Sequence, residues 1–151
     1  METIEPLLAG HPFFKGLAPE HLKLIVGCAQ NKVFEPGQFI FREDEEANSF
    51  YIIRKGRVAV ETFSPEHGEI TIQTRTEGEV LGWSWLIAPY RWRFDARVTE
   101  QTRAVVLDGK CLREKCEKDH NLGYELMKRF ALIIAERLEA TRLQLLDVYG
   151  K

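Results

Sequence analysis

The pattern of apolar and polar positions changes twice along the chain and divides it into three parts. Residues 1–30 predict helix, because apolar residues recur at the spacing of one helix face behind Pro19, a residue suited to a first helical turn. Residues 31–108 consist of short apolar or β-branched runs between turn residues, and residues 109–151 return to helical spacing. The apolar face of the first helix consists of Leu22, Ile25, Val26 and Ala29.

The middle part predicts an antiparallel sheet, because its runs recur about every 8–12 residues with no long helix between them. This spacing favours a β-roll or jelly roll (a double-stranded β-helix) over a βαβ fold. We therefore predict one mainly β domain over residues 1–151, with a helical lead-in at 1–30, a β-roll at 31–108 and C-terminal helices at 109–151. The runs are QFIF, SFYIIR, RVAVETF, EITIQTR, ARVT and RAVVLD.

The C-terminal part predicts a short helix, GKCLREKCEKD, and a long helix from about Asn121 to Tyr149. At 1.5 Å per residue the long helix would extend roughly 40 Å, which is more than one compact β-domain can cover. Its early apolar stripe consists of Leu122, Leu126, Phe130 and Ile133. A second stripe has the spacing of a two-stranded coiled-coil seam and consists of Met127, Ala131, Ile134, Leu138, Thr141, Leu145 and Val148.

Two apolar stripes on one helix need two surfaces to bury them. We expect the early stripe to dock on the chain's own β-domain and the seam to dock on a second copy, because an exposed seam of this length favours association. The alternative is a monomer whose long helix folds back along one side of the domain.

Composition and charge exclude several classes of protein. The chain has 151 residues, of which 44% are hydrophobic and 29% charged, and its net charge is −2. This balance is typical of a soluble globular domain without a general attraction to nucleic acid or anionic lipid. The N-terminus lacks the basic and apolar regions of a signal peptide, and no apolar stretch approaches the ~20 residues of a membrane helix. We therefore expect a cytoplasmic protein whose cysteines, Cys28, Cys111 and Cys116, are free thiols.

All three tryptophans fall between residues 83 and 92, interleaved with arginines. If this segment is a strand, residues 92, 94 and 96 share one face and residues 91, 93, 95 and 97 share the other. One interpretation is an apolar pocket rimmed by guanidinium groups, suited to an aromatic or acyl anion. The other is that the indoles fill the pocket, while the arginines are solvated or paired with Asp95.

Other patterns of reactive residues are weak. Gly82-Trp83-Ser84 matches the first half of a nucleophile elbow, but Leu86 replaces the second glycine. Cys111, Cys116 and His120 have the spacing of neither a zinc ribbon nor a zinc finger. We predict neither an enzyme nor a metal site.

The stretch GQFIFREDEEANSFYIIRKGRVAV, residues 37–60, resembles the opening of the cyclic nucleotide-binding domain, the sensory β-roll of the catabolite activator protein superfamily. That family typically shows a glycine before an aromatic-aliphatic strand, an acidic turn, a Tyr-aliphatic-aliphatic strand and then Gly-x-Val. HPFFKGLAPEHLKLI resembles the family's helical lead-in, and the long C-terminal helix resembles its dimerisation helix. The resemblance implies a roll of about eight strands, with ligand bound inside where a short helix offers backbone N–H groups to a phosphate.

We call residues 82–93 the cassette segment, because the resemblance places the family's phosphate-binding cassette there. The family pattern is Phe-Gly-Glu-x-Ala-Leu, a short loop, then Arg-Ser/Thr-Ala; the Glu accepts a hydrogen bond from the ribose and the Arg pairs with the cyclic phosphate. Without gaps, Trp83 stands at the Glu position and Trp85 at the Ala position. Trp92 stands at the Arg position and Arg93 at the Ser/Thr position.

Loss of both polar anchors would weaken cyclic nucleotide binding by roughly 10³-fold or more. A shift of one residue in the loop would instead make Arg91 or Arg93 the phosphate partner. Transcription factors of the superfamily carry a helix-turn-helix after the long helix, whereas only Gly150 and Lys151 follow here, so we expect no DNA-binding element.

Our first hypothesis is a bacterial small-molecule sensor in which a ligand enters the roll at the cassette segment and shifts the 121–149 helices between two dimer states. Candidate ligands are a cyclic nucleotide or another small anionic or aromatic molecule. The alternatives are a ligand-free dimeric interaction module with a tryptophan-filled pocket, and a true cyclic nucleotide binder that uses Arg91 or Arg93. The candidate pocket residues are Gly82, Trp83, Ser84, Trp85, Arg91, Trp92 and Arg93.

Overall fold

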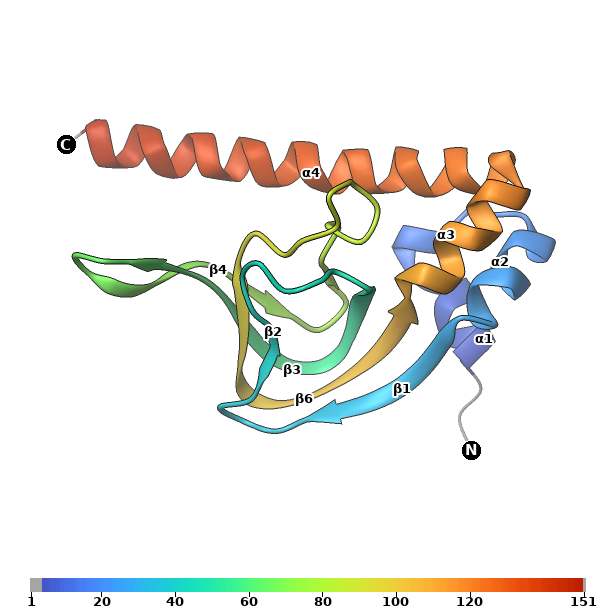
Figure 1. Ribbon diagram of the computed structural model, residues 1–151, viewed down its shortest axis with the longest axis horizontal. Coiled ribbons are helices and arrows are strands. Elements are labelled where there is room, and N and C mark those ends of the chain that lie inside the picture. The colour runs from blue at the N-terminus through green and yellow to red at the C-terminus, as the bar shows by residue number, and fades with distance from the viewer. Residues whose placement is uncertain (1–3, 151) are drawn as a thin grey trace.

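The computed structural model describes residues 4–150 and shows a β-roll flanked by helices (Figure 1). The lead-in helices and α3 lie at one end of the roll, and α4 runs along one side from that end to above the β3–β4 hairpin (Figure 1). The helices are α1 (Ile4–Ala9), the 3-10 helix η1 (Pro12–Phe14), α2 (Pro19–Val26), α3 (Gly109–Lys118) and α4 (His120–Tyr149). The strands are β1 (Ala29–Phe34), β2 (Phe39–Phe41), β3 (Ser49–Ser64), β4 (Gly68–Thr76), β5 (Val80–Leu81) and β6 (Asp95–Asp108).

The six strands form one antiparallel sheet, which confirms the predicted fold class. The main order is β1-β6-β3-β4, with β2 paired to β6 and β5 paired to β3. The described residues hold fewer strands than the expected eight, because two pairs of predicted runs are continuous. SFYIIR and RVAVETF both belong to β3, and ARVT and RAVVLD both belong to β6.

The long strand β3 passes through a turn signal because Gly56 allows it to bend. The β3–β6 register shifts on both sides of this glycine, which has a φ of 117°. A Cβ atom at position 56 would lie 2.5 Å from the Thr102 hydroxyl oxygen and 2.6 Å from its Cα. The close approach and the positive φ both require glycine here, so the predicted turn is a bend within one strand.

The predicted helical lead-in ends earlier than expected. Helix α2 ends at Val26, and Ala29 begins β1, so the prediction that Ala29 continues the helix face is wrong. β1 was absent from the predicted runs because it is polar and exposed along most of its length. It is nevertheless held by β6, through the register from Ala29↔Leu107 to Phe34↔Thr102.

Helix α4 begins one residue before the predicted start and ends where predicted. Its early stripe docks on the domain as expected: Leu122, Leu126 and Phe130 are buried, and Ile133 is half-buried against the core. The second predicted stripe, which we call the α4 seam, lies on another face of the helix. It contains exposed apolar side chains, including Met127, Leu138, Leu145 and Val148.

The expectation of three free thiols is wrong, because Cys28 and Cys111 form a disulfide and only Cys116 is free within the described residues. The pairing of β1 with β6 places Ala29 opposite Leu107. The Asp108 amide also donates a hydrogen bond of 2.9 Å to the Cys28 carbonyl. This pairing brings the end of α2 beside the first turn of α3, although the two cysteines are 83 residues apart in sequence.

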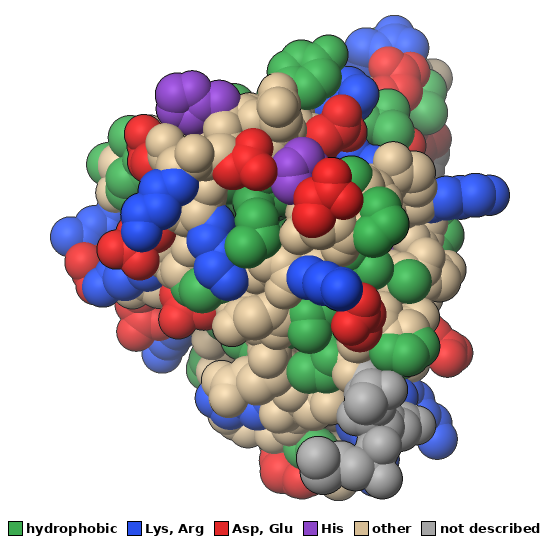
Figure 2. All heavy atoms as spheres, turned by 90° about the vertical axis from the view of Figure 1, so that its right-hand side faces the viewer, with side chains coloured by type: hydrophobic (Ala, Val, Ile, Leu, Met, Phe, Trp, Pro, Cys, Tyr) green, Lys and Arg blue, Asp and Glu red, His purple; other side chains and the backbone are tan. Residues whose placement is uncertain are grey.

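The end of the molecule that faces right in Figure 1 carries acidic and basic side chains intermixed, without a large patch of one sign (Figure 2). This distribution agrees with the balanced composition of the chain. No helix between residues 4 and 150 has both the length and the apolar character needed to cross a membrane.

Candidate functional site

The cassette segment is a loop between β5 and β6 rather than a strand. Regular pairing in β6 starts at Asp95, and position 91 contributes only an isolated bridge to Glu46. The predicted alternation of faces over residues 91–97 is therefore wrong. Asp95 is buried and accepts a hydrogen bond of 2.8 Å from the Glu43 amide, so it does not stand on a solvated arginine face.

Trp92 occupies the interior of the roll at this site. Its indole is buried and lies parallel to the Phe41 ring, with ring centroids 3.6 Å apart and an interplanar angle of 7°. The cavity that remains has a volume of about 20 Å³, room for about one water molecule. Its lining includes four of the predicted pocket residues, namely Gly82, Trp83, Ser84 and Trp92.

The backbone at Gly82 is shaped to accept the Trp92 ring. Gly82 has a φ of 95°, and a Cβ atom there would lie 2.7 Å and 2.8 Å from two carbon atoms of the indole. A side chain at position 82 would therefore both strain the backbone and collide with the ring. The glycine that the resemblance aligns with the cassette here provides space for an aromatic side chain of the protein itself.

Trp85 lies on the other side of the cassette segment, between the roll and the helices. It is fully buried, stacks on Phe50 at 5.1 Å and meets the α4 residue Phe130 edge-on at 5.5 Å. Its carbonyl accepts a hydrogen bond from the α3 residue Arg113, whose guanidinium lies 4.3 Å above the Tyr90 ring. Trp85 thus ties the cassette segment to α3 and α4.

Trp83 forms a third link, to the middle of α4. The Arg137 guanidinium lies 5.0 Å from the centre of its indole, and Arg137 also donates a hydrogen bond of 3.1 Å to the Val80 carbonyl. Burial of this guanidinium, with the positive charge of Arg75 nearby, lowers the pKa of Arg137 to about 10. The three tryptophans therefore have three separate packing roles.

The two arginines considered as phosphate partners lie outside the small cavity. Arg91 and Arg93 are exposed, and neither contributes to its lining. Arg91 donates a hydrogen bond of 3.1 Å to the Asp44 carbonyl, whereas the described structure gives the Arg93 side chain no hydrogen bond or ion pair. The acidic turn before β3 holds the C-terminal end of the cassette segment through backbone hydrogen bonds. The Asp44 amide donates to the Trp92 carbonyl, and the Trp92 amide donates to the Glu45 carbonyl.

The roll also contains an ion pair that the sequence interpretation missed. Arg97 donates two hydrogen bonds of 2.9 Å to the Glu61 carboxylate, whose side chain is only 3% exposed. These hydrogen bonds lower the pKa of Glu61. The available signal was a single acidic residue after the apolar run RVAV in β3. One interpretation of the sequence left the arginines solvated or paired with Asp95 instead.

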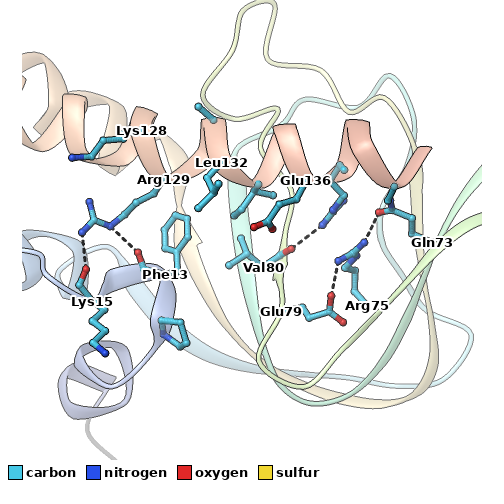
Figure 3. A pocket seen from close by; sticks show the side chains of 15 residues that line it. Phe13, Lys15, Gln73, Arg75, Glu79, Val80, Lys128, Arg129, Leu132 and Glu136 are labelled. Carbon is cyan, nitrogen blue, oxygen red and sulfur yellow. Dashed lines mark hydrogen bonds and ion pairs between the residues drawn. The ribbon is translucent and has the colours of Figure 1, made fainter. Parts of the chain in front are cut away.

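A larger cavity of about 1000 Å³ lies outside the roll, between α4, β4 and the lead-in (Figure 3). We call it the α4 groove. Its lining brings together segments far apart in the sequence, which is why sequence patterns did not indicate it. The lining residues are Pro12, Phe13, Lys15, Gln73, Arg75, Glu79, Val80, Lys128, Arg129, Ala131, Leu132, Ile133, Glu136, Arg137 and Ala140.

Comparison with known proteins places this geometry in a family. Residues 31–119 match the family described as the cyclic nucleotide-binding domain. A crystal structure from Geobacter metallireducens GS-15, described as a cyclic nucleotide-binding protein, is 33% identical and superposes with a TM-score of 0.81 over 91% of this chain and 99% of that one.

Two curated relatives match over different lengths. Human cGMP-dependent protein kinase 2 is 33% identical over 88 residues, which cover 58% of this chain and 12% of the kinase. The CRP-like cAMP-activated global transcriptional regulator of Mycobacterium tuberculosis is 23% identical over 145 residues, which cover 96% of this chain and 63% of the regulator. The chain thus spans less than two thirds of each of these relatives. Because the family model matches residues 31–119 and most of the chain superposes on a related structure, the chain belongs to the cyclic nucleotide-binding domain family.

Proposed function

We propose that the chain is a small-molecule-sensing regulatory domain in which tryptophan side chains occupy the place of a cyclic nucleotide. The observation that carries this proposal is Trp92, stacked on Phe41 with about 20 Å³ left beside it. Ligand pockets usually enclose roughly 300–1,000 Å³, so the nucleotide position is closed while Trp92 keeps this place. This closure argues against a cyclic nucleotide as the molecule that the domain senses.

The electrostatics of the cassette segment also support this proposal. The resemblance puts Trp83 where a carboxylate would accept the ribose hydrogen bond, and an indole can only donate a hydrogen bond. Arg91 and Arg93 are exposed, so a phosphate in the roll would need one of them to turn inward. A cyclic nucleotide would therefore need both a displaced tryptophan and a rebuilt pair of anchors.

The contacts of the cassette segment suggest how a conformational change there would be transmitted to the helices. Trp85 packs on Phe130 of α4, and Arg113 of α3 binds the Trp85 carbonyl. Trp83 lies under Arg137, farther along α4. A shift of the cassette segment would therefore disturb both helices, and this coupling suits a population shift between two arrangements of α4.

We also propose that the domain is a homodimer joined through the α4 seam. Its exposed leucines, methionine and valine lie on one face of a helix whose other face docks on the roll. Burial of this face in a coiled coil would remove apolar surface from water, which stabilises the dimer by about 25 cal/mol for each Å² buried.

The test is a titration of the purified chain with cyclic AMP and cyclic GMP, followed by tryptophan emission and by thermal unfolding. All three indoles lie in or beside the cassette segment, so a nucleotide there would change the emission. We expect no change in either measurement up to millimolar nucleotide. Micromolar binding that is lost in Arg93→Ala or Arg91→Ala would overturn the proposal in favour of a true cyclic nucleotide binder.

A further inference from the structure

The α4 groove shares Arg137 with the cassette cavity and Ala131 with the α4 seam, and its other lining residues belong to neither. Arg137 is the one residue that lines both the groove and the cassette cavity. Leu132 and Glu136 each stand two positions from the seam residue Ile134, which turns them by roughly 200° from it about the helix axis, although Leu132 also adjoins the seam residue Ala131. Ala131 lies at the border of both surfaces. A second helix on the seam would thus leave the groove open.

The end of the groove beside Arg75 and Arg137 carries hydrogen-bond donors that are only partly used. Arg75 contacts Glu79 and Gln73, but its Nε atom is buried and has no hydrogen-bond partner in the described structure (Figure 3). Arg137 donates its hydrogen bond to a carbonyl rather than to a carboxylate. Glu79 and Glu136 line the same end of the groove, whereas the other basic residues of the lining, Lys15, Lys128 and Arg129, lie toward Phe13 (Figure 3). Arg137, which lines the groove and has no ion pair in the described structure, is therefore the side chain available to an anion there.

The rest of the groove offers an apolar path away from this end. Leu132 of α4 lies along one side, with Phe13 of η1 and Val80 at other points of the wall (Figure 3), and Ile133 also contributes to the lining. The Leu132 side chain is 62% exposed. Arg129 uses its donors on the carbonyls of Phe13 and Lys15 and on Glu125, so it fixes this wall.

A groove of this kind matches a ligand with a charged head and an extended apolar tail. The head must be an anion that accepts hydrogen bonds, because guanidinium groups only donate. The tail must be apolar and slender, since it would lie along Leu132 and Phe13, where Lys128 and Arg129 are already paired with Glu125. The lining of α4 from Lys128 to Ala140 extends roughly 18 Å, which suits a chain rather than a compact ring.

We propose that the α4 groove binds a medium- or long-chain fatty carboxylate, with its carboxylate at Arg75 and Arg137 and its tail along Leu132 toward Phe13. The site goes beyond the proposed function and stands whether or not the cassette segment accepts a nucleotide. Because Arg137 also covers Trp83, the ligand would meet the residue that joins the groove to the cassette segment.

The experiment titrates the purified chain with dodecanoate, below its micelle concentration, and follows binding by calorimetry and tryptophan emission. Dodecanol, which has the same tail without the charge, is the control ligand. We expect dodecanoate to bind at least about tenfold more tightly than dodecanol, because the alcohol cannot form the charge-assisted hydrogen bonds. Equal binding of the two would show simple partition into an apolar surface and would overturn the proposal.

Variants locate the site. Arg137→Gln and Leu132→Asp should each weaken dodecanoate binding about tenfold or more. Arg142→Gln, on the exposed part of α4 where Arg142 pairs with Glu139, should leave it unchanged. Leu132 is exposed, so Leu132→Asp keeps the test valid if Arg137→Gln disturbs folding. Unchanged affinity in Leu132→Asp, or a change of oligomeric state in that variant, would overturn the proposal, the latter in favour of an interface between copies.

Discussion

Trp92 fills the centre of the roll, and its loss should have a large energetic effect. The ring is buried, stacked on Phe41 and fitted against Gly82. We expect Trp92→Ala to lower the free energy of unfolding by about 3–5 kcal/mol, through lost burial and the cavity left behind. Urea unfolding at pH 7 measures this effect. Trp83→Ala is the matched control and should cost less, because Trp83 is only half-buried; equal losses would contradict the central role of Trp92.

Glu61 should make the stability of the roll depend on pH. The hydrogen bonds from Arg97 lower its pKa in the folded state, so the folded protein favours the ionised carboxylate. The resulting stabilisation is complete above the pKa of Glu in the unfolded chain and is lost as pH falls through the lower pKa of the folded state. We expect Glu61→Gln to reduce stability at pH 7 by about 1–3 kcal/mol, since Arg97 remains partly in water.

Unfolding curves at pH 7 and at acidic pH separate this effect from simple packing. The difference in stability between the native chain and Glu61→Gln should shrink as pH falls below the ordinary range of a glutamate. Glu66→Gln, at the exposed tip of the β3–β4 hairpin, is the control and should follow the native chain throughout. A difference that stays constant with pH would show that charge is not responsible.

Single residues show where sequence interpretation reached its limit. The tryptophans were recognised as departures from the family pattern, because the aligned motif indicates which side chain is expected at each position. Their partners were not predicted: Phe41, Phe130 and Arg137 come from three different elements. The pairing of Arg97 with Glu61 likewise depends on the β3–β6 register, which the two separate runs do not specify.

At the scale of elements, the Cys28–Cys111 disulfide joins the end of α2 to the start of α3. Closing a loop of 83 residues restricts the unfolded chain, and this should stabilise the fold by about 2–4 kcal/mol. We therefore expect dithiothreitol, or the Cys28→Ser substitution, to lower the urea midpoint. Cys116→Ser should leave the response to dithiothreitol unchanged, because Cys116 is free. Three reactive thiols in the untreated protein would contradict the disulfide.

Elements with strong periodicity were predicted well, and those that depend on tertiary pairing were not. Helix α4 has an uninterrupted apolar pattern over its whole length, which locates both of its ends closely. Strand β1 carries almost no apolar pattern, because it lies at an edge of the sheet with most side chains exposed. The continuity of β3 across Gly56 depends on its close pairing with β6 and so could not be predicted from a Lys-Gly pair alone.

At the scale of the whole molecule, α4 is the element on which the other surfaces meet. Its buried stripe rests on the roll, its flank lines the α4 groove, and its seam faces solvent. Arg137 joins the groove to the cassette segment through Trp83. A change in the tilt of α4 would therefore alter the groove and the seam together, so the two surfaces are coupled through one helix.

Dimerisation through the seam is the prediction that tests this arrangement. We expect sedimentation velocity at micromolar concentration to show about twice the chain mass of 17.5 kDa. Leu138→Lys, at a seam position that is 69% exposed, should shift the protein toward monomer, because it places a charge in the coiled-coil core.

Leu143→Lys is the matched control, because Leu143 is 55% exposed but lies off the seam. It carries the same substitution on the same helix and should leave the mass unchanged. If both variants dissociate alike, the contact is a general apolar association along α4 rather than a specific coiled coil. If the native chain sediments as a monomer, the exposed seam must instead serve another partner, and a change in the tilt of α4 would be transmitted to that partner rather than across a dimer.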